Sequence, residues 1–388
     1  MRQAQKYEEI EPLLKLCKAG RLFDVQNWIA EGKPINPSSE IDKKRGKKSP
    51  LQVSMDTGFH SLVEQLLKSG ASLEEPGYCP LQHALRKRRF DLIELLVNHG
   101  KNIHSVDMNM VFETWDPQII EYLIEKGGDL KNGNPLAEAL CNRIRTALGV
   151  FKRYEHKFPF LKEQVDIALR YHCKEGNLKW VSLMLWAGGN PYLKGPDSPY
   201  YDDPEEYVSA LELAALYGHT DVFKLKNIKL DPSNEIAGDL LRNCCFSDDC
   251  HFLKTLLEKG YDPRQMEDKG SSLIQSLIYS MTLDFNPYTY TRNQKDIDTS
   301  RSRRKVEMIH MLVRHGAQWQ PENDGTVNDT RRSFLKMKDD YVMEFVWIMS
   351  EYQACTRHSV ERLMKTPSIR SLISKHTARY NELLENFN

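Results

Sequence analysis

The chain has 388 residues, and its 54 Lys and Arg side chains balance 54 Asp and Glu side chains, so the formal net charge is zero. This balance argues against a general nucleic-acid or membrane binder, and the length predicts several domains or an elongated array rather than one compact core. Eight cysteines without a CxxC pair, no signal-peptide core and no apolar run near the ~20 residues of a membrane span predict free thiols in a soluble cytoplasmic protein.

A pair of short helices recurs along the chain. Its clearest sign is a glycine between the two helices and a second glycine that ends the pair, at the same spacing in Gly20 and Gly32, Gly58 and Gly70, and Gly176 and Gly188. The stretch 74–100 contains the whole unit: a turn, two runs with apolar residues at helical spacing, and a closing Gly100 that is expected to have a positive φ. Helices this short cannot bury their apolar faces alone, so each pair requires neighbours.

These units resemble the ankyrin repeat. The best matches are the sequences EEPGYCPLQHAL and ALELAALYGHTDV, together with the closing dipeptides Gly70-Ala71 and Gly316-Ala317. The resemblance implies an all-α ankyrin-repeat solenoid of about nine or ten stacked helix-turn-helix units, several of them degenerate. One departure from the family pattern is Gln82 or Glu212 at the position of the family's histidine.

The repeat array is expected over residues 1–321, followed by a helical cap over 322–388 that covers the last apolar face. A docking box for another protein is the alternative use of these C-terminal helices. Two segments between units, 33–48 and 195–208, are too long for the repeat and are predicted to project along one edge. A third, about 281–304, lies inside a unit and is predicted to project at the opposite edge and to be disordered when unbound.

In ankyrin proteins the turn tips and the exposed ends of the first helices form a concave binding groove. By this resemblance, Asp56, Thr57, Thr114, Leu216 and Ile278 are groove positions. The partner-binding residues that we predict are Lys48, Tyr78, Arg86, Lys87, Glu113, Lys174, Glu175, Tyr217 and Tyr279 in the groove, and Tyr200 and Tyr201 in a projecting turn. Neither Tyr78 nor the run 86–89 is expected to contribute to the stacking.

Charged residues gather at four places in the sequence. Basic side chains occur at Lys43, Lys44, Arg45, Lys47, Lys48 and in the run 86–89, and they occur again at Arg301, Arg303, Arg304 and Lys305; acidic ones follow Tyr201 at Asp202, Asp203, Glu205 and Glu206. The simplest interpretation is solvated loops and helix ends. The functional interpretation is that these clusters bind a partner whose surface carries complementary charges. The basic region at 43–89 also supports an alternative function as a nucleic-acid-binding component, although aromatic residues for base stacking are missing there.

No catalytic motif of the GxSxG, HExxH or GxxxxGK[ST] type occurs. The compact group Cys244, Cys245, Cys250 and His251 lacks CxxC spacing and is predicted to pack in the core rather than to bind zinc. We therefore expect no enzyme, no metal and no cofactor. The leading hypothesis is a non-catalytic scaffold or adaptor that binds a protein through the groove and the long turns, and that could regulate or inhibit this partner.

Overall fold

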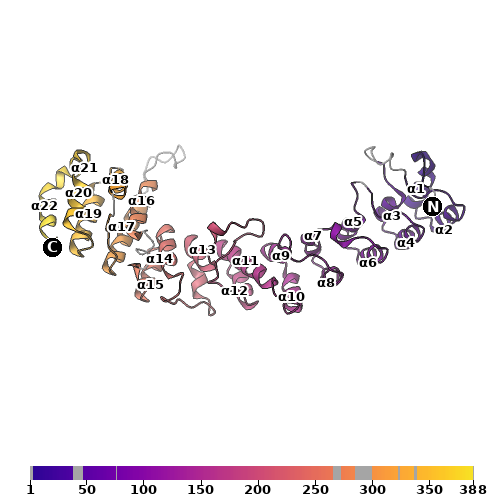
Figure 1. The fold of residues 1–388 in the computed structure, drawn as a ribbon, viewed down its shortest axis with the longest axis horizontal. Coiled ribbons are helices and arrows are strands. Elements are labelled where there is room, and N and C mark those ends of the chain that lie inside the picture. Colours follow the sequence, from indigo (N-terminus) through magenta and orange to yellow (C-terminus); the bar gives the residue numbers. More distant parts are fainter. Residues whose placement is uncertain are drawn as a thin grey trace. The chain divides into compact units, whose positions relative to one another are not determined.

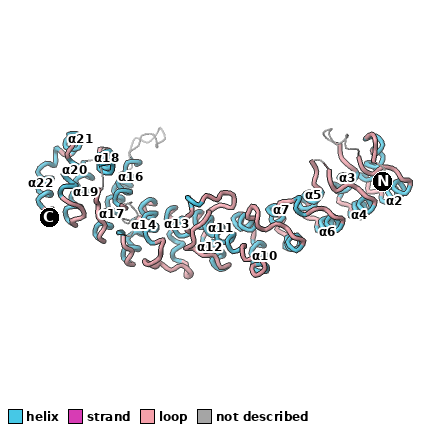
Figure 2. Tube along the Cα trace, viewed as in Figure 1, coloured by secondary structure: helices cyan, strands magenta, loops and turns pink. Residues whose placement is uncertain are grey.

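A computed structural model describes residues 3–37, 47–75, 77–264, 272–284, 299–321, 324–335 and 339–387. In this part of the chain, helices alternate with turns and loops, and the bridges between extended residues are isolated ones (Figure 2). The predicted all-α class is confirmed. The chain divides into two compact units, Met1–Ala168 and Leu169–Asn388. Within the described ranges, no helix is long and apolar enough to cross a membrane.

Unit 1 consists of helix pairs that follow one another in chain order (Figure 1). Each first helix packs on the next first helix and each second helix on the next second helix, which gives two rows. The helices are α1 (Glu11–Lys18), α2 (Leu22–Ala30), α3 (Pro50–Thr57), α4 (His60–Lys68), α5 (Pro80–Arg86), α6 (Phe90–Asn98), α7 (Met108–Phe112), α8 (Pro117–Glu125), α9 (Pro135–Cys141) and α10 (Arg145–Tyr154), with short 3-10 helices η1 (Tyr7–Glu9) and η3 (Ile103–Ser105).

Unit 2 has the same two-row packing, and the boundary between the units falls inside α11 (Leu161–Lys174). One row contains α13, α14, α16, α18 and α20, and the other contains α15, α17, α19 and α22. The bounds are α12 (Leu178–Trp186), η4 (Pro204–Glu206), α13 (Ala210–Leu216), η5 (Thr220–Lys224), α14 (Ala237–Phe246), α15 (Cys250–Glu258), α16 (Leu273–Asp284), α17 (Thr299–Arg314), α18 (Asp324–Phe334), α19 (Asp339–Glu351), α20 (Arg357–Met364), α21 (Pro367–Leu372), η7 (Ser374–His376) and α22 (Thr377–Glu385).

The row packing continues across residue 321, where a cap was expected to begin. α16 packs on α18, and α17 packs on α19. Trp319 is fully buried, and its backbone N–H donates to the Ala354 carbonyl at 2.7 Å. The indole N–H of Trp319 donates to Gln275 Oε1 at 3.2 Å. The helices on both sides of residue 321 share one packing pattern, so the structure marks no boundary there. The division into a repeat array and a cap at this residue stays a prediction.

Apolar side chains at helical spacing form the core of each pair. In the unit 74–100 the predicted apolar residues of α5 are buried, as are those of α6 except the half-buried Val97. Burial of one such aliphatic side chain contributes about 1.5–3 kcal/mol. Gly100 has φ +86°, as the sequence predicts for the end of the pair. This unit therefore folds as its sequence pattern indicates.

The turn between the two helices of a pair requires a left-handed residue, and this residue is not always glycine. Gly58 has φ +67°, and its N–H donates to the Ser54 carbonyl at 3.1 Å, which ends α3. Arg88, Trp115 and Asp248 hold the same place with φ of +50°, +61° and +57°. A side chain in this conformation costs about 1–2 kcal/mol. A search for glycine alone therefore misses these turns.

Two residues that were assigned to binding rather than stacking belong to the packed structure. Arg89 Nη1 donates to the Gly58 carbonyl at 2.9 Å, and Arg89 Nε donates to Asp91 at 2.8 Å, so this side chain joins two successive turns. The Tyr78 ring packs edge-on against His83 with 5.9 Å between ring centroids. The prediction that the run 86–89 takes no part in stacking is wrong for Arg89, while Arg86, Lys87 and Arg88 are exposed.

The ends of the predicted insertion 281–304 are helical. Met281 is a buried residue of α16, and Arg301 lies in the first turns of α17. Arg301 Nη2 donates to Asp248 Oδ2 at 2.8 Å, and Lys305 Nζ lies 3.7 Å from Asp248 Oδ1. The prediction of a projecting loop is therefore wrong at both ends, and residues 285–298 lie outside the described residues.

The buried charge of Asp248 generates a stability prediction. Lys305 is only 3% exposed, so replacing Asp248 with Asn removes a counter-charge from a buried ammonium. Asp248→Asn is expected to lower the free energy of unfolding by about 3–5 kcal/mol, and adding Lys305→Met is expected to recover part of this loss. Chemical denaturation of the three variants measures both effects. Asp221→Asn, at an exposed ion pair with Lys224, is the control and should change little. An equal loss in the control would contradict the prediction.

Candidate partner-binding surface

The projecting turn 195–208 is held against the end of α11. The buried Arg170 donates from Nε to the Pro196 carbonyl at 2.6 Å and from Nη1 to the Leu193 carbonyl at 3.1 Å. The backbone N–H of Gly195 donates to the Val208 carbonyl at 3.2 Å, which closes the base of the turn. Hydrogen bonds from a charged donor to backbone carbonyls contribute about 1.5–3 kcal/mol each. The turn is therefore fixed at its base.

A second contact fixes the same turn from the last residue of α11. Lys174 Nζ lies 2.7 Å from Asp197 Oδ2 and 5.8 Å from the centroid of the Tyr217 ring. The hydrogen bond with Asp197 raises the pKa of Lys174, so the ammonium is present across the physiological range. The His219 ring also contacts the Lys174 carbonyl at 3.0 Å through Nε2. Lys174, Tyr217 and the projecting turn thus form one continuous surface.

The residues just before the turn are anchored by a charge network in which an exposed lysine meets two buried carboxylates. Lys194 Nζ lies 2.8 Å from Asp239 Oδ2 and 3.3 Å from Glu212 Oε1. Burial lowers the pKa of Lys194, but the two carboxylates outweigh it and the pKa is raised. Glu212 also accepts from the backbone N–H of Ser209 at 2.7 Å and so forms the capping box of α13. Glu212, which departs from the family histidine, has a structural role here.

The tip of the turn presents two aromatic residues beside carboxylates. Tyr200 is 72% exposed and Tyr201 is 53% exposed, which is unusual for such large side chains. Asp203 caps η4 by accepting from the Glu205 N–H at 3.0 Å, and Tyr207 donates to Asp202. The tip therefore combines apolar contact area with negative charge on a fixed backbone, the combination that suits a protein interface.

Two of the predicted groove residues in unit 1, Lys48 and Tyr78, belong to one cluster around Asp56. Lys48 Nζ lies 2.6 Å from Asp56 Oδ2, and His83 Nδ1 lies 3.9 Å from Asp56 Oδ1. The Tyr78 ring packs against His83. The Tyr78 hydroxyl is buried and has no hydrogen-bond partner among the described residues. Burial raises the pKa of Tyr78 and lowers that of His83. This cluster is half-buried, so it offers less free side-chain surface than the turn of unit 2.

The remaining predicted residues stand apart from these clusters. Arg86, Lys87, Glu113 and Glu175 are exposed at the ends of their helices, and Tyr279 is exposed in the middle of α16. Of these, Glu175 adjoins Lys174. Two other predicted groove positions are wrong, because Thr114 and Ile278 are buried in their repeat units. Thr114 donates its hydroxyl to the Val111 carbonyl at 2.7 Å, which turns the side chain inward.

Sequence reasoning missed two features, the contacts that hold the turn 195–208 and an exposed tryptophan in unit 1. Arg170 and Asp197 hold the turn, but neither stands at a groove position, so no family pattern points to them. Trp115 was missed because the inter-helix position was searched for glycine; it is 54% exposed. Regular spacing from the start of the preceding helix could have found Trp115, whereas only the tertiary structure brings Arg170 and Asp197 to the turn.

The predicted core packing of the cysteine group is confirmed for Cys244 and Cys245 but is wrong for His251, which is exposed, while Cys250 is half-buried. Cys244 and Cys245 are buried in α14, and burial raises the pKa of both thiols. Burial raises the pKa of Cys250 to about 11, and its Sγ lies 3.5 Å from the Arg304 carbonyl oxygen. A different group, Asp339, Asp340 and His376, is close enough among the described residues to share a cation. His376 Nε2 lies 3.5 Å from Asp339 and 3.6 Å from Asp340, so an ion pair with protonated His376 explains this group equally well.

Helix pairs that bury their apolar faces only between their neighbours define a helical repeat protein. The family model for ankyrin repeats, in three copies, matches residues 13–107. The chain therefore contains ankyrin repeats.

Known proteins with similarity to this chain also contain ankyrin repeats. The "Ankyrin repeat and KH domain-containing protein mask-1" of Caenorhabditis elegans is 23% identical over 299 residues, which cover 71% of this chain and 11% of that protein. The chain therefore spans about a tenth of the length of that relative. Among solved structures, the human ASB11 ankyrin repeat domain is 16% identical with a TM-score of 0.36, covering 60% of this chain and 97% of that one. The Bcl-3 ankyrin repeat domain is 18% identical with a TM-score of 0.30, covering 65% and 87%.

The close approach of Gly195 to Arg170 generates a prediction about the turn. A Cβ at residue 195 would lie 2.6 Å from Arg170 Nη2, so the guanidinium would have to leave its two carbonyl acceptors. Gly195→Ala is expected to destabilise unit 2 by about 1–3 kcal/mol and to speed proteolysis within 195–208. Gly149→Ala is the control, because its Cβ meets nothing within 4 Å and alanine favours the helix. Equal proteolysis rates in the two variants would show that Arg170 does not hold the turn.

Proposed function

We propose that the protein is a non-catalytic scaffold that binds a protein partner through the turn 195–208 and the adjoining ends of α11 and α13. Ankyrin repeats are in general modules for protein–protein interaction. The observation that supports this particular surface is the pair Tyr200 and Tyr201, exposed on a backbone that Arg170 and Lys174 hold in place. Fixed anchors lose little conformational entropy on binding, so more of the contact energy appears as affinity.

The charge of the turn indicates the chemistry of this partner. Glu205 and Glu206 are exposed, and no ion pair joins either of them to a described residue. A basic partner surface would gain attraction from these carboxylates and would be steered toward the two tyrosines. The partner is therefore expected to present Lys or Arg around an apolar depression.

The nucleic-acid alternative gains less support. Among the described basic residues of the region 43–89, Lys48 pairs with Asp56 and Arg89 pairs with Asp91 at 2.6 Å. Lys47 lies over the Tyr7 ring at 4.1 Å, and Lys43, Lys44 and Arg45 lie outside the described residues. Charges already paired within the protein contribute less to phosphate binding. A gel-shift titration against salt separates the two functions, since phosphate contacts predict a steep loss of affinity with salt.

The test of the proposed function uses the partner itself. It is captured from the native cell, identified by mass spectrometry and purified, and its affinity for the full chain is measured by calorimetry. The double variant Tyr200→Ala and Tyr201→Ala is expected to weaken binding at least tenfold. Truncation of an interface anchor commonly costs about 2 kcal/mol of binding free energy, which corresponds to roughly a thirtyfold loss of affinity. Raising the salt concentration is expected to weaken binding further.

The matched control is Phe23→Ala on α2, an equally exposed aromatic residue far from the turn in the sequence. It should leave the affinity unchanged. Unchanged affinity in the double tyrosine variant, or an equal loss in the control, would contradict the assignment of this surface.

A further inference from the structure

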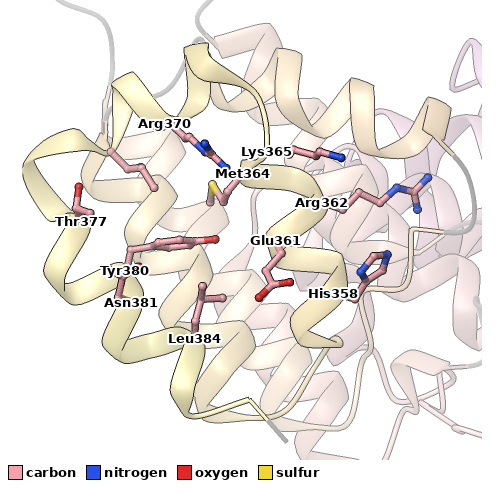
Figure 3. A pocket seen from close by; sticks show the side chains of 11 residues that line it. His358, Glu361, Arg362, Met364, Lys365, Arg370, Thr377, Tyr380, Asn381 and Leu384 are labelled. Carbon is pink, nitrogen blue, oxygen red and sulfur yellow. The ribbon is translucent and has the colours of Figure 1, made fainter.

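A hollow of about 830 Å³ lies among the last helices of unit 2, between α20 and α22 and beside α21 (Figure 3). Its volume falls within the ~300–1,000 Å³ of ligand-binding pockets in proteins. Neither the groove predicted from the family nor the turn 195–208 includes any of its lining residues. The hollow is therefore a separate place where another molecule could bind.

The floor of the hollow is apolar. Met364, Ile373 and Leu384 line it and are themselves at least nine-tenths buried in the protein. The ring of Tyr380 extends into the space from α22, as Figure 3 shows. The Tyr380 hydroxyl makes no hydrogen bond to a described residue, and burial raises its pKa, so it is a neutral donor facing the hollow. An apolar side chain of a ligand would be shielded from water when it packs on this floor.

The rim of the hollow carries an excess of positive charge. Arg370, Lys365 and Arg362 line it, together with one carboxylate, Glu361. Glu361 accepts from Arg357 Nε at 2.8 Å, so its charge is already compensated. Arg370 points into the hollow opposite Tyr380, whereas the charged ends of Lys365 and Arg362 point away from Tyr380 at the other side (Figure 3). A ligand with negative charge fits this rim.

We propose that this hollow docks an acidic peptide segment of a partner protein. One carboxylate of the segment forms a bidentate salt bridge with the Arg370 guanidinium and accepts a hydrogen bond from the Tyr380 hydroxyl. A neighbouring aliphatic or aromatic side chain of the segment packs on Met364 and Leu384. The remaining rim charges attract further carboxylates along the segment.

The two parts of the hollow together favour a peptide over other occupants. A small inorganic anion would pair with Arg370 but would gain nothing from the apolar floor. A purely apolar ligand would make no charged contact with Arg370 and would remove water from its guanidinium, which costs free energy. A peptide that alternates apolar and acidic side chains satisfies both parts at once.

The experiment measures fluorescence anisotropy of labelled peptides with the full-length chain. The first peptide alternates Leu and Phe with Asp and Glu, the second has each acid replaced by its amide, and the third keeps the acids but replaces Leu and Phe with Ser. The first is expected to bind at least tenfold more tightly than either of the others. Arg370→Glu is expected to weaken its binding at least tenfold, and Tyr380→Phe severalfold.

Arg379→Glu is the matched control, because it makes the same change of charge on an exposed residue of α22 that does not line the hollow. It should leave the affinity within twofold, and circular dichroism of all variants checks that they are folded.

Three results would overturn the proposal: no binding of the first peptide, equal binding of its amide form, or equal losses in Arg370→Glu and Arg379→Glu. Displacement of the peptide by an equal concentration of inorganic phosphate would show a simple anion site and would also overturn it. Concentration-dependent self-association that Arg370→Glu abolishes would assign the hollow to a second copy of this chain instead. None of these results depends on the tyrosines of the projecting turn.

Discussion

Each helix pair buries its apolar face only against the next pair, and the rest of the structure depends on this constraint. A helix of seven to nine residues, such as α5 or α6, has too few hydrogen bonds to be stable alone. Its leucines become buried only when neighbours cover both sides. The fold therefore tolerates changes in the turns, and the turns can carry residues chosen for other purposes.

Polar and charged contacts decide how rigid each turn is. Arg89 bonds the turn before it, and Arg170 with Lys174 bonds the turn after α12. These contacts join residues of successive helix pairs and turns, so they fix the backbone where apolar packing is absent. The projecting turn 195–208 consequently presents Tyr200 and Tyr201 from a fixed base, which is the physical ground for assigning partner binding to it.

Two surfaces of unit 2 have opposite charge and different shape. The projecting turn is acidic and exposes two tyrosines at its tip, whereas the hollow among α20, α21 and α22 is basic at its rim and apolar at its floor. A partner that suits one surface would be repelled by the other. If both proposals hold, the protein brings two different partners together, and substitutions in one surface leave the other intact.

The sequence alone determined the repeat, the all-α class and most of the core, because the spacing of apolar residues and closing glycines is a local pattern that repeats in register with the helix. It also indicated Lys174, Tyr200, Tyr201 and Tyr217 as candidates, but without their relation to one another. Tertiary structure decided that Arg89, Lys305 and Arg301 serve the packing, that Thr114 and Ile278 are buried, and that Arg170 and Asp197 hold the turn. The reason is that the role of a charged or polar residue depends on the residue it contacts. These contacts join residues that are far apart in the sequence, and no periodic pattern connects them.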